Sequence, residues 1–246
     1  MKTTKKITTF LFIFILSGLT SLFAGCHSFY KGGDVAVKKE TRQVGSFTGI
    51  QVGGAFEIYI TQTGTPSVVV EADEDIIGYI ETEVEGGILK IGMKKAPGAC
   101  LNHVKTMNVY ITVADLTSLD LSGAVEVKFE NQVKANDLDV EISGAVEADL
   151  NLSVVKMEME MSGACELSLQ GTGQDLSIQA SGASELNAFD FVVQNLNLYA
   201  SGANEANVNV TGTLKVKASG ACDVRYKGSA NVDVYTSGAS SVRKED

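Results

Sequence analysis

Acidic side chains recur at one position of a repeated motif. The tripeptide Ser-Gly-Ala occurs seven times, with consecutive copies 18 to 21 residues apart, starting at Ser122, Ser143, Ser162, Ser181, Ser201, Ser219 and Ser237. In the first six copies an acid stands two residues after Ala, whereas Ser241 stands there in the seventh. The acids are Glu126, Glu147, Glu166, Glu185, Glu205 and Asp223. Carboxylate oxygens bind Ca²⁺ and attract cationic groups, so these six acids are the candidate binding residues.

A solvated edge is the simpler interpretation of the same acids. One acid per repeat supplies few ligands, and the nonapeptide pattern of Ca²⁺-binding repeats is absent. The repeated Ser is interpreted as a hydrogen-bonding residue, since seven copies cannot all be nucleophiles. No phosphate-binding loop, zinc-ligand spacing or nucleophile elbow is found. We therefore expect no catalytic residues, no metal site and no cofactor.

The N-terminus has the pattern of an export signal. Residues 1–6 are basic, residues 7–23 are largely apolar, and the segment ends in Leu22-Phe23-Ala24-Gly25-Cys26. Small residues followed by Cys resemble the bacterial lipobox, in which the chain is cut before a lipid-modified Cys. We predict a lipoprotein signal peptide at 1–25, a membrane anchor at Cys26 and a polar tether at 26–45. An ordinary signal peptide followed by an incidental Cys is the alternative.

Composition excludes several classes of protein. The chain of 246 residues has 44% apolar residues, 25 Gly, 2 Pro and a formal net charge of −10. Disordered chains carry fewer apolar residues, and long coiled coils carry less Gly. A nucleic-acid partner is not expected because such a surface needs clustered Lys and Arg.

Alternating apolar residues around each motif indicate strands with one buried face. In an antiparallel sandwich one tripeptide has no reason to recur, whereas in a parallel solenoid every copy occupies the same corner. We predict an all-β fold, a right-handed parallel β-helix or solenoid with about 18–21 residues per coil. Val125, Val146, Cys165 and Cys222 are then predicted to point inward, and the acids outward.

The same register predicts the positions of two further sets of residues, the Cys residues and two Tyr residues. Equivalent residues of neighbouring coils lie about 4.8 Å apart. Cys165 and Cys222 are three coils apart and therefore too distant for a disulfide, and Cys100 has no assigned partner. Tyr199 and Tyr235 are predicted to point outward with Lys217 between them, where aromatic rings could contact sugars or a partner.

The segment before the repeats differs from them. Residues 80–84 and 88–93 flank Glu85-Gly86-Gly87, a predicted hairpin turn. A solenoid end exposes strand edges and core, so an atypical terminal segment is expected to cover it. We predict one domain at 46–242, with an N-terminal β cap at 46–115 and the Ser-Gly-Ala repeats at 116–242.

The residues resemble a known family. Phe47-Thr48-Gly49-Ile50-Gln51-Val52-Gly53-Gly54-Ala55-Phe56-Glu57, the acidic run from Glu71 to Asp75 and the reiterated Ser-Gly-Ala are similar to the head GIN domain adhesins, common among envelope lipoproteins of Bacteroidetes. The resemblance covers roughly residues 45–242. It implies a β-helical fold and a cell-envelope setting, and it carries no catalytic residues.

These observations predict a non-catalytic, exported lipoprotein, anchored by lipid to the cell envelope at the outer membrane. It would present a rigid solenoid surface for adhesion, ligand binding or scaffolding, with a glycan or protein as partner. Two alternatives remain open: a polysaccharide-active β-helix enzyme, and a Ca²⁺-dependent module that uses the repeat acids. Coil lengths vary by only three residues, which leaves little room for a catalytic cleft.

Overall fold

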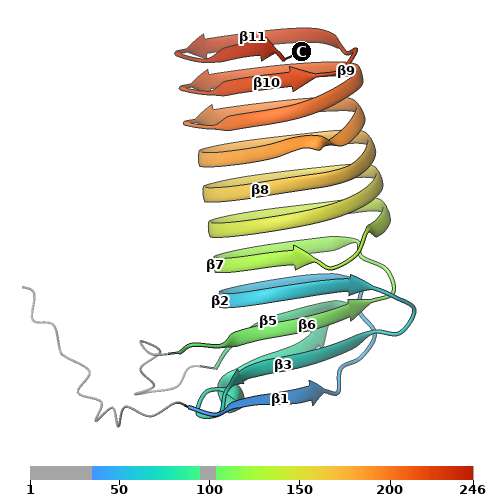
Figure 1. Ribbon diagram of the computed structural model, residues 1–246, viewed down its shortest axis with the longest axis vertical. Helices are drawn as coiled ribbons and strands as arrows, with labels where there is room; N and C mark the ends of the chain where they lie inside the picture. Colours follow the sequence, from blue (N-terminus) through green and yellow to red (C-terminus); the bar gives the residue numbers. More distant parts are fainter. Residues whose placement is uncertain (1–34, 95–103, 246) are drawn as a thin grey trace, which may run out of the picture. The chain divides into compact units, whose positions relative to one another are not determined.

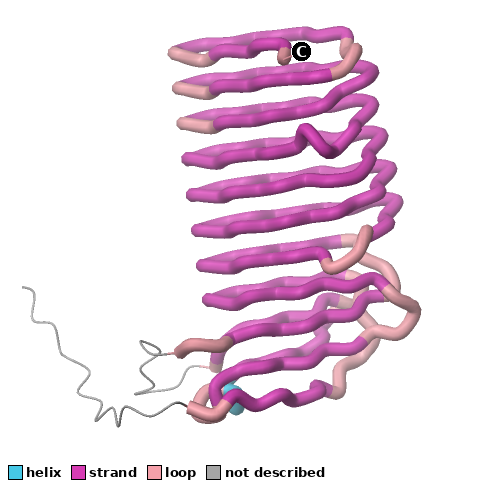
Figure 2. Tube along the Cα trace, viewed as in Figure 1, coloured by secondary structure: helices cyan, strands magenta, loops and turns pink. Residues whose placement is uncertain are grey.

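The protein is an all-β chain with a mostly parallel sheet (Figures 1 and 2). The computed structural model describes residues 35–94 and 104–245, so the predicted leader, Cys26 and Cys100 lie outside the described residues. Within that part the helical structure is one 3₁₀ turn, η1 (Ile77–Tyr79). The strands are β1 (Val37–Arg42), β2 (Gly49–Gln62), β3 (Ser67–Asp73), β4 (Ile80–Glu85), β5 (Ile88–Met93), β6 (Met107–Val113), β7 (Ser118–Phe129), β8 (Val133–Gly202), β9 (Glu205–Gly220), β10 (Asp223–Lys227), β11 (Asn231–Gly238) and β12 (Ser241–Lys244).

Successive Ser-Gly-Ala copies stack in register. In the β7–β8 pairing Ser122 lies beside Ser143, and in the β8–β9 pairing Ser201 lies beside Ser219. Both pairings are parallel, as the sequence predicted. We call each passage of chain from one motif to the next a rung, and Figure 1 shows the rungs lying one above another. Equivalent side chains therefore form columns across the rungs.

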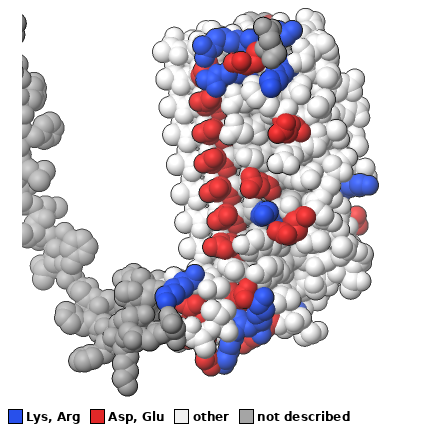
Figure 3. Space-filling view, viewed as in Figure 1, with Lys and Arg blue, Asp and Glu red and all other residues white. Residues whose placement is uncertain are grey.

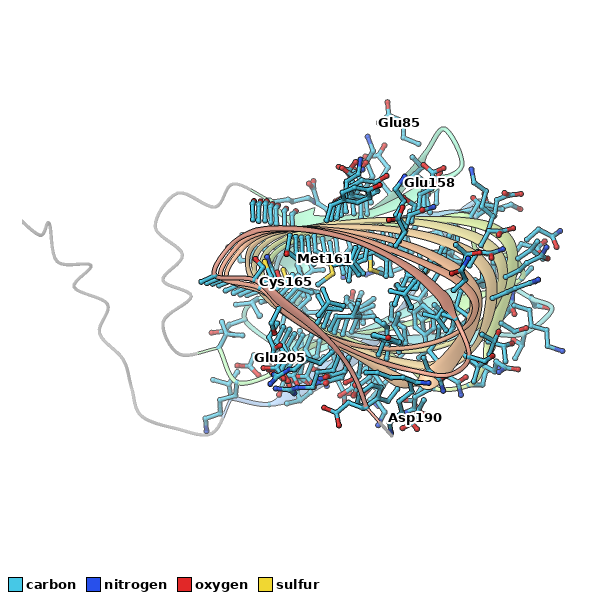
Figure 4. The ribbon with its side chains drawn as sticks, turned by 90° about the horizontal axis from the view of Figure 1, so that it is seen from above. Glu85, Glu158, Met161, Cys165, Asp190 and Glu205 are labelled. Carbon is cyan, nitrogen blue, oxygen red and sulfur yellow. The ribbon has the colours of Figure 1, made fainter. Side chains whose placement is uncertain are left out.

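The core follows from the alternation in each strand. Along β7 and β8 the alternate apolar side chains are buried, while their neighbours in sequence are exposed or half-buried. Val125, Val146, Cys165 and Cys222 are buried, which confirms the predicted inward set. Figure 4 shows Met161 and Cys165 pointing into the interior, and Glu158 and Glu205 pointing outward from opposite faces. Cys165 and Cys222 are free thiols.

The columns are interrupted where the register between β8 and β9 shifts. The register shifts after Ala188, where β8 holds extra residues, and again after Val193, where β9 holds one extra residue. The bulged segment includes Phe191, whose side chain is buried. A Cβ on Gly173 would lie 2.9 Å from the Phe191 ring, so the missing side chain at Gly173 makes room for it. A β-bulge of this kind changes the length of one rung without changing its neighbours.

The N-terminal segment lies at one end of the stack (Figure 1). Its first long strand, β2, pairs in parallel with β7 and places Gly54 beside Gly123 and Glu57 beside Glu126, so β2 continues the columns of the repeats. β5 and β6 pair in parallel with β2, and β4 pairs antiparallel with β5, which confirms the predicted hairpin. β3 and β1 then add antiparallel strands beyond β6. The described residues contain no helix long and apolar enough to cross a membrane.

Candidate binding surface

A sharp edge runs along the stack where the Ser-Gly-Ala motifs lie. Gly144 has a φ of +105°, a conformation that residues with a side chain rarely adopt. A Cβ on Gly144 would also lie 2.4 Å from the carbonyl oxygen of Gly123 in the preceding rung. The other Gly residues of the motif share the positive φ. Gly is therefore required at the apex both for the turn and for the close approach of neighbouring rungs.

The repeated Ser supports this edge. Ser122 Oγ donates to the carbonyl oxygen of Val52 at 3.1 Å, and Ser181 Oγ donates to that of Met161 at 3.3 Å. Val52 precedes Gly53-Gly54-Ala55, which pairs with the first motif, and Met161 precedes Ser162 of the third motif. These hydroxyls thus connect consecutive rungs, in agreement with the hydrogen-bonding role predicted from the repeat.

Polar side chains lie inside the edge as well as outside it. Cys165 Sγ, Cys222 Sγ and Ser240 Oγ each donate to the carbonyl oxygen of the Ser three residues earlier, at 3.5, 3.3 and 3.1 Å. Burial raises the pKa of the Cys165 thiol, which keeps it protonated as a donor. A carbonyl removed from water without a hydrogen-bond partner costs free energy, and these hydrogen bonds explain why polar side chains occupy inward positions next to the edge. The inward position was predicted, whereas this hydrogen bond was not.

The six predicted acids form one column on the outer surface. Figure 3 shows a line of acidic side chains along one face. Glu126, Glu147, Glu166 and Glu185 are exposed and Glu205 is half-buried. Glu57 extends the column at its N-terminal end through its pairing with Glu126. The predicted outward position of the acids is therefore confirmed.

The column is neutralised at its C-terminal end. Arg225 donates to Glu205 at 2.6 Å and to Asp223 at 3.0 Å, and Arg243 donates to Asp223 at 2.5 Å. The Ser241 hydroxyl, followed by the two guanidinium groups, holds the pKa of Asp223 below its ordinary value. Within the described residues Glu147, Glu166 and Glu185 form no ion pair, so the charge of this part of the column is uncompensated.

A shallow groove separates this acid column from the edge. It has a volume of about 680 Å³ and is lined by the Ala methyl groups of the motifs and by the acids from Glu126 to Glu205. We call it the acid groove. The column brings the acids into a line but not to one point. In residues 35–94 and 104–245 no three acidic, Cys or His side chains gather closely enough to hold a metal ion.

A second groove runs along the other side of the edge. It has a volume of about 600 Å³ and is lined by the motif Ser residues from Ser143 to Ser237 and by the side chains that stand two residues before each motif. We call it the serine groove. That second column is Asp120, Glu141, Glu160, Gln179, Tyr199, Lys217 and Tyr235.

The chemistry of the serine groove changes along its length. Near one end the column holds three carboxylates and the amide of Gln179, whose Nε2 donates to Glu160 Oε1 at 3.2 Å. Near the other end Lys217 pairs with Tyr199 on one side and with Tyr235 on the other. Lys217 Nζ lies 5.3 Å from the centre of the Tyr199 ring, and Tyr235 is exposed. The predicted Tyr-Lys-Tyr order along one outward column is confirmed.

Sequence reasoning missed the two Arg residues that compensate the acid column. Arg225 and Arg243 each stand two residues after the repeated acid position, so they point to the same face as the acids. The alternation of side chains along a strand, together with the repeat register, could have predicted that these Arg residues lie beside the acids. The serine groove itself could be anticipated only in part, from the outward Tyr residues.

Comparisons with known proteins agree with this arrangement. Residues 46–230 match the family model described as "Putative auto-transporter adhesin, head GIN domain". A putative adhesin from Bacteroides fragilis has 21% identity and a TM-score of 0.79, over 85% of this chain and 97% of that chain. A putative adhesin from Parabacteroides distasonis has 23% identity and a TM-score of 0.68, over 87% and 98%.

A putative lipid binding protein from Parabacteroides distasonis has 21% identity and a TM-score of 0.64, over 85% of this chain and 97% of that chain. Comparison with curated protein sequences found no match. The structural likenesses concern the fold, whereas the family model covers most of the chain, including β2 and the first six Ser-Gly-Ala motifs. The chain therefore belongs to the head GIN domain family of adhesin-like proteins.

Proposed function

We propose that this protein is a non-catalytic lipoprotein of the cell envelope that presents a rigid, right-handed β-solenoid for adhesion. In this proposal residues 1–25 are the signal peptide, lipid on Cys26 anchors the chain in the outer membrane, and 26–45 is the tether. The in-register parallel pairing of β2, β7, β8 and β9 supports the solenoid. Parallel crossovers are nearly always right-handed, which supports the assigned hand.

Two lines of reasoning support an envelope location. Membership of an adhesin family implies an extracytoplasmic location. The basic head, apolar run and small residues before Cys26 have the order of a lipoprotein signal. Lipid chains hold a protein at a membrane through the burial of CH₂ groups, so a lipid on Cys26 would replace a membrane-spanning segment.

The serine groove is the surface that we assign to the ligand. The observation that carries this assignment is a groove of about 600 Å³ that is lined by the motif Ser residues and by Tyr199, Lys217 and Tyr235. A Ser hydroxyl that donates to the neighbouring rung can still accept a hydrogen bond, and Tyr offers an apolar ring with a polar tip. The column repeats at the spacing of parallel strands, about 4.8 Å. An extended glycan, with hydroxyl groups repeated along its length, fits these features.

The alternatives have weaker support. A polysaccharide-active enzyme needs acids that converge in a cleft, whereas the repeat acids lie in a line along an open groove. A Ca²⁺-dependent module needs several oxygen ligands at one point, and a single column supplies one carboxylate from each rung. Neither alternative is favoured by a particular group of side chains among the described residues.

A binding array tests the proposal. The chain from residue 26 onward, with Cys26→Ser so that no lipid is attached, is applied to arrayed glycans and matrix proteins with and without Ca²⁺. The groove variant Tyr199→Ala with Tyr235→Ala is compared with the acid variant Glu147→Gln, Glu166→Gln and Glu185→Gln. We expect the groove variant to lose about tenfold or more in affinity, because Tyr residues in binding surfaces often contribute over about 1.4 kcal/mol. The acid variant should retain binding.

Other outcomes would contradict parts of this proposal. Loss of binding in the acid variant alone would place the ligand in the acid groove, and a strict need for Ca²⁺ would favour the module. Release of shortened glycan from the array would make the protein an enzyme. Binding to none of the arrayed glycans or proteins would remove the support for adhesion through this groove.

A further inference from the structure

The two ends of the stack differ in how their strand edges are protected. At the N-terminal end, β1 carries Lys38, Lys39, Glu40 and Arg42, and β4 carries Glu81, Glu83 and Glu85. Charged residues on edge strands discourage pairing with other chains. At the C-terminal end, β11 has the sequence NVDVYTSG, in which Asp233 is the one charged residue, and the shorter β12 carries Arg243 and Lys244. Along β11 the charged residues that protect an edge strand are therefore nearly absent.

The second end leaves backbone groups and core side chains open. Among the described residues β11 pairs with β9 and β12 pairs with β10, each on one side only. Val234 pairs with Val216 in β9, and its side chain is 41% exposed whereas Val216 is fully buried. β11 therefore covers the inward Val of β9, whereas the equivalent inward Val of β11 itself is left open among the described residues. β11 pairs with β9 over eight residues without a bulge, so its free edge is straight and regular.

We propose that two copies of the chain associate by their C-terminal ends, with β11 of each copy lying antiparallel to β12 of the other. The two-fold axis runs through the Ser-Gly-Ala edge near Gly238, so residues equally far before and after Gly238 oppose each other. A two-fold interface uses the same patch on both copies, as this geometry requires.

Side chains of matching character meet in this arrangement. Val234 of one copy opposes Val242 of the other, and both continue the inward columns of their own strands. Asp233 of one copy opposes Arg243 of the other, and both lie on the outward side. Arg243 already donates to Asp223, and a guanidinium has enough donors for a second carboxylate. Two apolar residues therefore meet inside the stack and opposite charges meet outside it, while farther from the edge Val232 of one copy lies opposite Lys244 of the other.

Self-association as a function of concentration tests this proposal. Sedimentation velocity of the chain from residue 26 onward, with Cys26→Ser, should show the mass doubling as concentration rises. Val234→Lys with Val242→Lys should remain a monomer at every concentration, since it places charges in the apolar part of the interface. Val155→Lys is the matched control, because Val155 is 48% exposed and lies in β8, away from the end. This control should still dimerise.

A charge exchange tests the pairing itself. Asp233→Arg should raise the dissociation constant of the dimer about tenfold or more, as expected for a close interfacial charge pair. Asp233→Arg combined with Arg243→Asp should restore the dimer, and circular dichroism melting checks that each variant is folded. A wild-type chain that stays monomeric, or that binds a foreign strand without self-association, overturns the proposal. Equal dimerisation of the Val234→Lys/Val242→Lys variant also overturns it.

Discussion

Asn204 donates a hydrogen bond from its side-chain Nδ2 to the carbonyl oxygen of Ser201, three residues earlier, at 2.7 Å. The same side chain accepts a hydrogen bond through Oδ1 from the backbone N–H of Ser184 in the preceding rung, at 3.1 Å. Asn204 is buried at a position where two earlier rungs have Val. One amide thus satisfies a carbonyl in its own rung and an N–H in the neighbouring rung.

Replacing Asn204 tests the value of this amide. Asn204→Ala should lower the free energy of unfolding by about 1–3 kcal/mol, because the Ser201 carbonyl and the Ser184 N–H lose their partner in a buried position. Urea unfolding measures the difference. Asn197→Ala is the control, since Asn197 is exposed on β8. Equal losses for the two variants would contradict the structural role of Asn204.

Gly144 provides a test of the sharp edge. Gly144→Ala should destabilise the protein by at least about 1–3 kcal/mol, because Ala is strained at a φ of +105° and its Cβ would approach the Gly123 carbonyl oxygen to 2.4 Å. Thermal and urea unfolding measure the effect. Gly64→Ala is the matched control, since a Cβ there meets nothing within 4 Å and its φ is not positive. Similar stabilities of both variants would argue against the close approach of the rungs.

The repeated part of the fold could be predicted from the sequence, and the reason is physical. The spacing of Ser-Gly-Ala determines which residues lie side by side, and the period of two determines which point inward. Cys165 and Glu166 were therefore placed correctly on opposite sides of the sheet. The hairpin of β4 and β5 was predictable because its turn, with Gly86 and Gly87, is local.

The remaining pairings depend on contacts that no repeat encodes. β3 pairs antiparallel with β6, and β1 adds to β3, although neither strand contains the motif. Alternation identifies such segments as strands but does not choose their partners. At the candidate surface, the acids could be placed in a column, whereas the grooves depend on the curvature at the edge. Bonds such as that from Arg225 to Glu205 depend on side-chain conformation.

The lowered pKa of Asp223 predicts a pH-dependent contribution to stability. Hydrogen bonding by Ser241 and the neighbouring Arg243 and Arg225 favour the carboxylate in the folded protein. A depressed folded-state pKa gives stability that is present above the ordinary Asp value of 3.8 and is lost as pH falls through the folded value. Wild type should therefore exceed Asp223→Asn in stability at neutral pH.

The difference in stability between wild type and Asp223→Asn should shrink as the pH falls below the ordinary Asp pKa of 3.8. Urea unfolding at a series of pH values measures it. Asp149→Asn serves as the control, because Asp149 is exposed on β8 and its carboxylate forms no ion pair or hydrogen bond within the described residues. A stability difference for Asp223→Asn that is constant with pH would contradict the assigned role of its carboxylate.

The last prediction concerns lipid attachment at Cys26. Cells grown with a labelled fatty acid should incorporate the label into the wild-type protein, and the mature chain should begin at Cys26. Cys26→Ser should carry no label and should move from the membrane fraction to the soluble fraction of the envelope, because each buried CH₂ group contributes about 0.8 kcal/mol to membrane binding. Cys100→Ser should keep both label and location. Label on the Cys26→Ser variant, or a mature chain that begins at another residue, would contradict the lipoprotein assignment.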